Sequence, residues 1–400
     1  MFLKRIIPYV LSFIFLAASI VCVADWDKTV PKSEEVTKTS VNKPIEELRG
    51  IWVTYMTLDV ENEADKEAAF KNKIDTILID MENANLNTMI VQVRPFCDAL
   101  YRSRCYPWSH ILTGTQGEDP NYDPLEYIIT AAHERSIMVH AWVNPYRIST
   151  KNTPSELSEN HPYSKDSSIG VEVNDSLYLN PASDKAIKLI VDGARELAES
   201  YEIDGIQFDD YFYPPDCGDF DKADYEAYCA DTDTPLPLDD FRKENVSRMV
   251  AKVYQAVHQT KKDILFGISP QGNLKNNEGI YADVERWCSE NGYIDYICPQ
   301  IYFSLDNPSL TFENGLKDWL NLKKHDNLSV YIGIPAYKAG TDADGGTWLD
   351  NSDILMTEIE ITRSAGIDGF MLYSYDSFHN EENAEEVENV IRYLNTSPTQ

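Results

Sequence analysis

The feature that most constrains the fold is a rhythm of short apolar runs and amphipathic stretches, repeated eight times between residues 48 and 395. Each run has the length and β-branched content of a buried strand, and each following stretch has apolar residues at helical spacing. The predicted strands are 50–55, 88–93, 137–143, 203–208, 264–268, 294–297, 330–334 and 369–372. The predicted helices are 67–84, 124–134, 184–201, 239–260, 283–290, 312–324, 353–365 and 381–394. Eight such units predict an α/β fold, the (β/α)8 TIM barrel.

The predicted barrel is long for its class, and the excess lies in extended loops after strands 2, 3 and 4. These loops belong to the face on which barrels carry their active sites. A doubly wound open sheet is the alternative. It does not require eight units, and no glycine-rich phosphate loop follows the first predicted strand.

Residues 1–24 have the pattern of an export signal, with Lys4 and Arg5 before an apolar run that ends near Ala24. We therefore expect a secreted or cell-envelope protein. An uncleaved anchor is an alternative, because the run is about long enough to span a bilayer. Lipidation at Cys22 is a third, and either alternative would tether the protein to the membrane. Residues 25–47 are predicted to be a flexible linker, and residues 48–395 the barrel domain.

The charge balance limits the classes of partner. The formal net charge is −31, whereas nucleic-acid and membrane-surface binding need a basic footprint. This balance favours a neutral or weakly charged substrate. The chain also has 24 Tyr and 7 Trp, which suit stacking on sugars but also occur in large cores.

The cysteines suggest two local disulfides in an oxidising compartment, Cys97 with Cys105 and Cys217 with Cys229. Cys288 and Cys298 have the surroundings of buried thiols. The Cys and His positions match no zinc spacing, and the acidic loops 231–233 and 342–345 lack the full ligand spacing for calcium. We expect no metal and no cofactor.

Asp209 and Asp210 follow the predicted strand 203–208 directly. Adjacent carboxylates repel each other, which pushes one of them toward protonation. Such a pair is suited to acid/base catalysis. The plainer interpretation is a solvated turn with two surface acids.

The other strand ends in a barrel would meet around this pair. Their hydroxyl, amide and aromatic groups suit a polyol held by hydrogen bonds and ring stacking. The candidate substrate-binding residues are Trp52, Arg94, Asn144, Tyr211, Gln271, Asn273, Gln300, Tyr302, Tyr337, Tyr373 and Asp376. Trp142 and His140 also lie at the predicted strand ends. Several of these residues have a structural alternative: Trp52 and Trp142 as fillers of the barrel mouth, Arg94 as an ion-pair partner, His140 as a buried histidine, and Asp376 as a loop cap.

Several stretches together resemble the bacterial glycosyl-hydrolase-like family 10. They are LRGIWV at 48–53, VQVRP at 91–95, AWVNPYR at 141–147, DGIQFDDY at 204–211 and CPQIY at 298–302. The resemblance covers about residues 48–394 and implies an exported (β/α)8 glycoside hydrolase. The substrate it implies is a cell-wall or related N-acetylated glycan, such as peptidoglycan strands stripped of their peptides.

The fourth-strand stretch is also similar to that of chitinase-like barrels, but Tyr211 stands where those enzymes have the catalytic Glu. The adjacent pair is similar to that of barrel hexosaminidases. That similarity implies Asp210 as general acid/base, Asp209 as the group that orients the 2-acetamido group, and Tyr302 as its support. In the competing mechanism Asp209 is a nucleophile and Asp376 a more distant acid.

Two other functions stay open from the sequence. One is a catalytically silent glycan-binding barrel at the cell envelope, favoured by the missing Glu. The other is a metal-dependent deacetylase or esterase, which would need clustered metal ligands or an activated Ser. The seven His are scattered and no Gly-x-Ser-x-Gly stretch is present.

Overall fold

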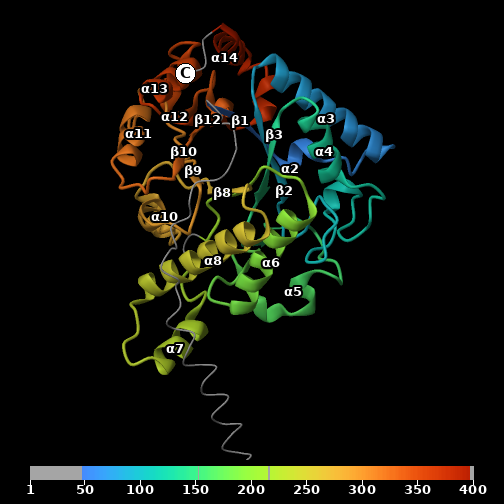
Figure 1. Cartoon of the computed structure of the whole chain (residues 1–400), viewed down its shortest axis with the longest axis vertical. Coiled ribbons are helices and arrows are strands. Elements are labelled where there is room, and N and C mark those ends of the chain that lie inside the picture. The colour runs from blue at the N-terminus through green and yellow to red at the C-terminus, as the bar shows by residue number, and fades with distance from the viewer. Residues whose placement is uncertain (1–46, 152, 215–216, 397–400) are drawn as a thin grey trace, which may run out of the picture. The chain divides into compact units, whose positions relative to one another are not determined.

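The computed structural model describes residues 47–151, 153–214 and 217–396. Its main sheet is entirely parallel, with the order β10-β9-β8-β7-β3-β2-β1-β12-β11. The strands are β1 (Leu48–Val53), β2 (Thr88–Arg94), β3 (Met138–Val143), β7 (Gly205–Phe208), β8 (Leu265–Ile268), β9 (Tyr296–Ile297), β10 (Ser329–Val330), β11 (Ile332–Ile334) and β12 (Gly369–Leu372). The strands lie inside a surrounding layer of helices (Figure 1).

The sheet closes on itself through its seventh strand, which is broken at Tyr331 into β10 and β11. Segment β10 pairs with β9, and β11 pairs with β12. The Tyr331 N–H donates to the Ile297 carbonyl at 2.9 Å, so the break does not interrupt the ladder to β9. The predicted TIM barrel is therefore confirmed, with the predicted strand 330–334 divided in two.

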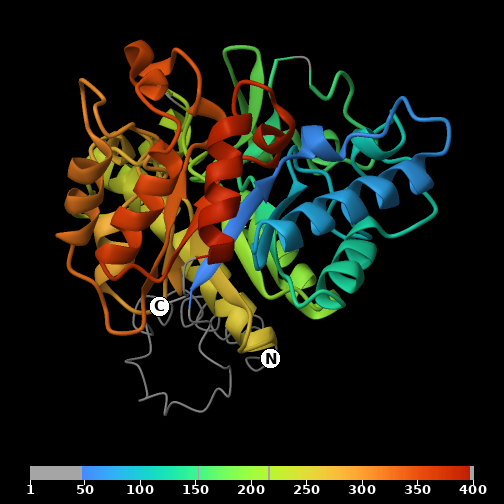
Figure 2. The same ribbon diagram turned by 90° about the horizontal axis from the view of Figure 1, so that it is seen from above.

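Helices cover the outside of the sheet, as the view from above shows (Figure 2). The α-helices are α2 (Tyr55–Leu58), α3 (Lys66–Asn83), α4 (Pro124–His133), α5 (Pro162–Lys165), α6 (Asp184–Ser200), α7 (Lys222–Asp231), α8 (Leu238–Thr260), α9 (Asn276–Gly279), α10 (Val284–Ser289), α11 (Phe312–Leu320), α12 (Ala343–Gly346), α13 (Ile354–Ser364) and α14 (Ala384–Thr396). The 3-10 helices are η1 (His110–Leu112), η2 (Ser167–Ile169), η3 (Ala336–Lys338), η4 (Thr347–Leu349) and η5 (Tyr375–His379).

Helix α6 illustrates why these segments fold as they do. The Ser183 side chain accepts a hydrogen bond from the Ala186 N–H and so caps the helix start. Ile187, Ile190 and Leu197 lie on one face and are buried against the barrel. Each such side chain stabilises the fold by about 1.5–3 kcal/mol.

The barrel interior contains two large polar rings, which require glycine on neighbouring strands. A Cβ atom at Gly205 would lie 2.7 Å from the His140 ring, and one at Gly267 would lie 2.2 Å from the Tyr296 ring. His140 Nδ1 and the Tyr296 hydroxyl form a 3.0 Å hydrogen bond. Burial lowers the pKa of His140 to about 4, so this histidine is neutral at neutral pH. Its role is structural.

The extended loops after strands 2, 3 and 4 are present as predicted. The loop after β2 contains η1, and the loop after β7 contains α7. The loop after β3 forms a separate antiparallel sheet of β4 (Arg147–Ser149), β6 (Ser176–Leu179) and β5 (Gly170–Val173). This sheet was not predicted, because its strands have three or four residues and are largely half-exposed.

The predicted disulfides are not formed, because all four of their cysteines are free thiols. Cys97 is buried near Arg94, and Cys105 is half-buried near Glu196, although the Cys105 thiol is also among the groups that raise the pKa of Cys97. Cys217 likewise interacts with Tyr281, and Cys229 with Tyr225. Each thiol therefore has a polar neighbour other than its expected partner.

The predicted export signal and all but the last residue of the predicted linker lie outside the described residues. Within the described part of the chain, no helix combines the length and apolar character needed to cross a membrane.

Candidate active site

Asp209 and Asp210 directly follow β7, and their side chains contact residues on different neighbouring strands or loops. Asp209 is 4% exposed and contacts Trp142 and Asn144, which lie on or just after β3. Asp210 is half-buried and contacts Gln300, which follows β9. The two acids therefore have different environments.

Asp209 is held by three donors. Trp142 Nε1 donates to Oδ2 at 3.2 Å, and Asn144 Nδ2 donates to the same oxygen. The Tyr211 N–H approaches Oδ1 at 3.5 Å. Because Oδ2 is occupied twice and Oδ1 is only weakly engaged, Oδ1 is the oxygen with capacity for a further donor.

A chain of amides fixes the orientation of Asn144. The Tyr55 N–H donates to Gln92 Oε1 at 3.0 Å, and Gln92 Nε2 donates to Asn144 Oδ1 at 2.6 Å. Arg147 Nη2 donates to that Oδ1 at 3.1 Å. Asn144 must therefore direct its NH₂ group at Asp209, where it favours the ionised carboxylate.

The pKa of Asp209 is raised to about 7, mainly by burial and secondly by the adjacent Asp210. Arg147 and the hydrogen bond from Trp142 oppose this shift. Burial also raises the pKa of Asp210, against hydrogen bonds from Gln300 and Gln271. Both carboxyls therefore titrate above their ordinary range, as acid/base groups do.

A tyrosine cluster formed by Tyr302, Tyr337 and Tyr373 borders the acid pair. Tyr302 and Tyr373 stack with ring centroids 5.7 Å apart, and Tyr337 meets both edge-on. Burial raises the pKa of both Tyr302 and Tyr373, and the nearby charges of Asp210 and Asp209, respectively, raise it further. The cluster offers aromatic faces and hydroxyls next to the carboxylates.

Asp376 lies at the edge of the site. It is exposed and accepts hydrogen bonds from Thr57 Oγ1 at 2.9 and 3.1 Å. This contact joins η5, after the last strand, to α2, after the first. Asp376 thus has the loop-tying role that was its structural alternative.

Three predicted substrate-binding residues are engaged in structural contacts. Trp52 is 2% exposed inside the barrel, donates to Gln207 at 2.6 Å and meets the Tyr373 ring edge-on at 5.9 Å, so it fills the mouth beside the tyrosine cluster. Arg94 is also buried, donates to the Asn144 and Pro145 carbonyls, and packs on the Tyr106 ring rather than pairing with an acid. The Asn273 side chain accepts from the Lys275 N–H within its own turn.

The candidates drawn from the sequence missed Gln92 and Arg147, and Trp142 was considered at the strand ends with a structural alternative. All three lie within stretches that carry the family resemblance. Gln92 is a strand residue, so a core role was the simpler interpretation. Arg147 follows a Pro-Tyr pair in a long loop, and only the fold returns it to the site.

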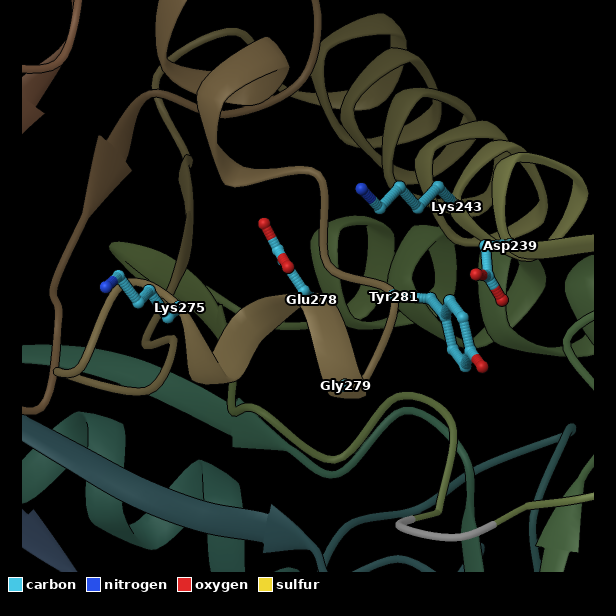
Figure 3. A pocket seen from close by; sticks show the side chains of 6 residues that line it. All are labelled: Asp239, Lys243, Lys275, Glu278, Gly279 and Tyr281. Atoms are coloured by element: carbon cyan, nitrogen blue, oxygen red, sulfur yellow. The ribbon is translucent and has the colours of Figure 1, made fainter.

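A separate hollow of about 430 Å³ lies between the start of α8 and the region of α9. Lys243 extends into it from α8, and Glu278 rises from the opposite wall (Figure 3). Asp239, Lys275, Gly279 and Tyr281 complete the lining. None of these residues is among those bonded to the acid pair.

In the described part of the chain, no group of three or more His, Cys, Asp or Glu is arranged to hold a metal ion.

The closed barrel with an acid pair and aromatic rings at its strand ends defines a glycoside-hydrolase type of protein. Comparison with known proteins makes this specific: the chain belongs to the glycosyl hydrolase-like 10 family, whose profile matches residues 47–349. The resemblance seen in the sequence is thereby confirmed.

Two relatives carry the name glycosyl hydrolase. The chain is 36% identical to YngK of Bacillus subtilis (strain 168) over 327 residues, which cover 76% of this chain and 63% of that protein. It is 28% identical to DigH of Escherichia coli (strain K12) over 404 aligned positions, covering 90% and 92% of the two chains.

Solved structures support the fold. The glycoside hydrolase domain of PgaB (BpsB) from Bordetella bronchiseptica matches with a TM-score of 0.56 and 13% identity, over 86% of this chain and 99% of that domain. An endo-1,4-beta-mannanase from Rhizomucor miehei matches with a TM-score of 0.55 and 11% identity, over 88% and 95%. At these identities the likeness concerns the fold alone.

Proposed function

We propose that the protein is an exported hydrolase that cleaves glycosidic bonds in a cell-wall or related N-acetylated glycan. The observation that carries this proposal is the unequal pair at the end of β7: a buried, firmly held Asp209 beside a half-buried Asp210 with a raised pKa. Family membership supports the reaction class, and the names of the relatives agree with it.

In the proposed mechanism Asp210 donates its proton to the glycosidic oxygen as the leaving sugar departs. The carbonyl oxygen of the substrate's own 2-acetamido group attacks the anomeric carbon and forms a cyclic intermediate. Asp209 accepts a hydrogen bond from the acetamido N–H through its less engaged Oδ1. Water then opens the ring and returns a proton to Asp210.

The hydrogen bonds of Asp209 favour this role over direct nucleophilic attack. Two donors occupy Oδ2, and the side chain is buried, so it is held in place rather than projected at a sugar carbon. Asp376, the distant acid of the competing mechanism, is exposed and bonded to Thr57. Tyr302 and Tyr373 would stack on and hydrogen-bond the sugar.

The test is mass spectrometry of products from peptide-free peptidoglycan strands, intact peptidoglycan and chitin oligomers. The same reactions are run with a variant carrying Asp209→Asn and Asp210→Asn. We expect short oligosaccharides from at least one N-acetylated substrate, and none with the variant. Binding to these glycans without any product would instead indicate a silent glycan-binding barrel and would refute the proposal.

A further inference from the structure

Arg147 differs from the other arginines in its charge environment. Among described residues, every arginine except Arg94, Arg147 and Arg392 has a carboxylate oxygen within 4.0 Å of its guanidinium. Arg94 is enclosed in the protein, and Arg392 is exposed on α14. Arg147 is the half-buried one and lies beside the acid pair.

The Arg147 side chain is fixed, but one of its nitrogens is left open. Nε donates to the Pro95 carbonyl at 2.8 Å, and Nη2 donates to Asn144 Oδ1 at 3.1 Å. The guanidinium lies 4.7 Å from the Phe96 ring centroid and 5.4 Å from that of Tyr211. Nη1 has no acceptor among the described residues, and it is not enclosed as Nη1 of Arg94 is.

Asn144 places this open cation next to Asp209. Its Oδ1 accepts from Arg147, and its Nδ2 donates to Asp209. The guanidinium lowers the pKa of Asp209 through its field, without an ion pair between them. The Asn144 side chain therefore lies between Asp209, the acid proposed to orient the acetamido group, and Arg147, whose Nη1 donates to no described residue.

The negative charge around Arg147 indicates what kind of ligand its open nitrogen could bind. The chain has a net charge of −31, and two carboxyls occupy the site, so an anionic ligand would be repelled without a fixed cation. Lys338, near Tyr302, is already paired with Asp344 at 3.0 Å. Arginine is the side chain best suited to a carboxylate, which it binds with charge-assisted hydrogen bonds.

We propose that Arg147 is a specificity-determining residue that binds a carboxylate on the sugar held by Asp209 and Asp210. This inference rests on the proposed function, because it places the 2-acetamido group at Asp209. Because Asn144 bonds both Asp209 and Arg147, we place the substituent of the adjacent C3 carbon on the Arg147 side. A carboxylate carried on a short C3 ether therefore fits, and a uronic acid in the neighbouring sugar is the other source of the same chemistry.

The experiment measures binding rather than turnover. Full-length protein with Asp210→Asn is titrated by calorimetry with peptide-free muramyl glycan strands, before and after their lactyl carboxylates are converted to amides. We expect amidation to weaken binding about 10- to 100-fold, since a hydrogen bond to a charged group is lost. Adding Arg147→Met should cause the same loss with native strands and abolish the effect of amidation.

Controls separate this role from a general loss of structure. Arg392→Met removes the same charge from the exposed surface and should preserve the discrimination. Arg147→Lys keeps the charge without the planar fork, and should retain part of it. Oligosaccharides of alternating N-acetylglucosamine and glucuronic acid test the uronic acid source; tighter binding of these than of muramyl strands, lost with Arg147→Met, would support the carboxylate site with that source.

The inference would be overturned if amidation of the strands did not weaken binding, or if it weakened binding equally with and without Arg147→Met. It would also be overturned if neither carboxylate-bearing glycan bound to the protein. Failure of the proposed function has a different signature. If native strands bind with the expected discrimination but the unmodified protein releases no products, the carboxylate site stands and the hydrolase proposal falls.

Discussion

Asn144 donates a hydrogen bond from its amide nitrogen to the buried oxygen of Asp209, and so ties the end of β3 to the candidate acid pair after β7. The amide is oriented from behind by Gln92, and its own oxygen is shared with Arg147. This one contact links the amide chain, the acid pair and the open arginine.

Asp210→Asn should lower kcat by about 10²–10⁴-fold, because that is the usual contribution of a general acid/base. Asp376→Asn is the matched control and should change kcat by less than about tenfold, because Asp376 only ties a loop to Thr57. Steady-state kinetics on the cleaved glycan measure both. A larger loss with Asp376→Asn than with Asp210→Asn would favour the nucleophile mechanism.

The pH profile of kcat/KM should have its acidic limb near pH 7, because Asp209 must be ionised and its pKa is raised to about 7. Activity should therefore rise with pH through this region. Arg147→Met should move the acidic limb upward, because the cation lowers this pKa. An acidic limb near pH 4 would contradict the assignment of Asp209.

Gln92→Leu should change the protonation of Asp209, although Gln92 is not proposed to contact the substrate. Asn144 would lose the donor that fixes its orientation, so the acidic limb should shift to higher pH and kcat should fall about tenfold with little change in KM. Gln207→Leu is the matched control, because Gln207 bonds Trp52 inside the same barrel. That variant should lose stability without shifting the pH limb.

Asp221→Ala should destabilise the fold by about 3–5 kcal/mol, because it leaves the Arg242 guanidinium buried and uncompensated. The pair is 2.6 Å apart with side chains 5% and 0% exposed, and Tyr213 also bonds Asp221. Lys185→Ala breaks an exposed pair and should cost less than about 1 kcal/mol. Denaturant unfolding measures both, and equal costs would contradict the argument.

Glu358→Gln should stabilise the protein at alkaline pH and have little effect near pH 4. Both carboxyl oxygens of Glu358 are buried without a partner, and burial raises its pKa well above the ordinary range. The folded state therefore holds its proton more tightly than the unfolded state, and stability falls as pH rises. Thermal unfolding of both proteins across pH 4–9 checks this, and parallel curves would refute it.

Much of the architecture was predictable from local pattern. The strand and helix rhythm predicted the barrel, because each segment encodes its own period and buried face. The break at Tyr331 was not predictable, because the apolar run is continuous there and the two halves differ only in which neighbouring strand they pair with. The small sheet after β3 also depends on tertiary contacts rather than on an apolar pattern.

The sequence by itself determined the adjacent acids, because their proximity is covalent and strand-end position follows from the apolar run before them. Only the tertiary structure decided that Asp209 is buried by Trp142 and Asn144 while Asp210 faces Gln300. It also enclosed Arg94 and left Arg147 open. Burial and hydrogen-bond partners decide whether a side chain is charged and which groups it can contact. Both depend on residues that are distant in the sequence.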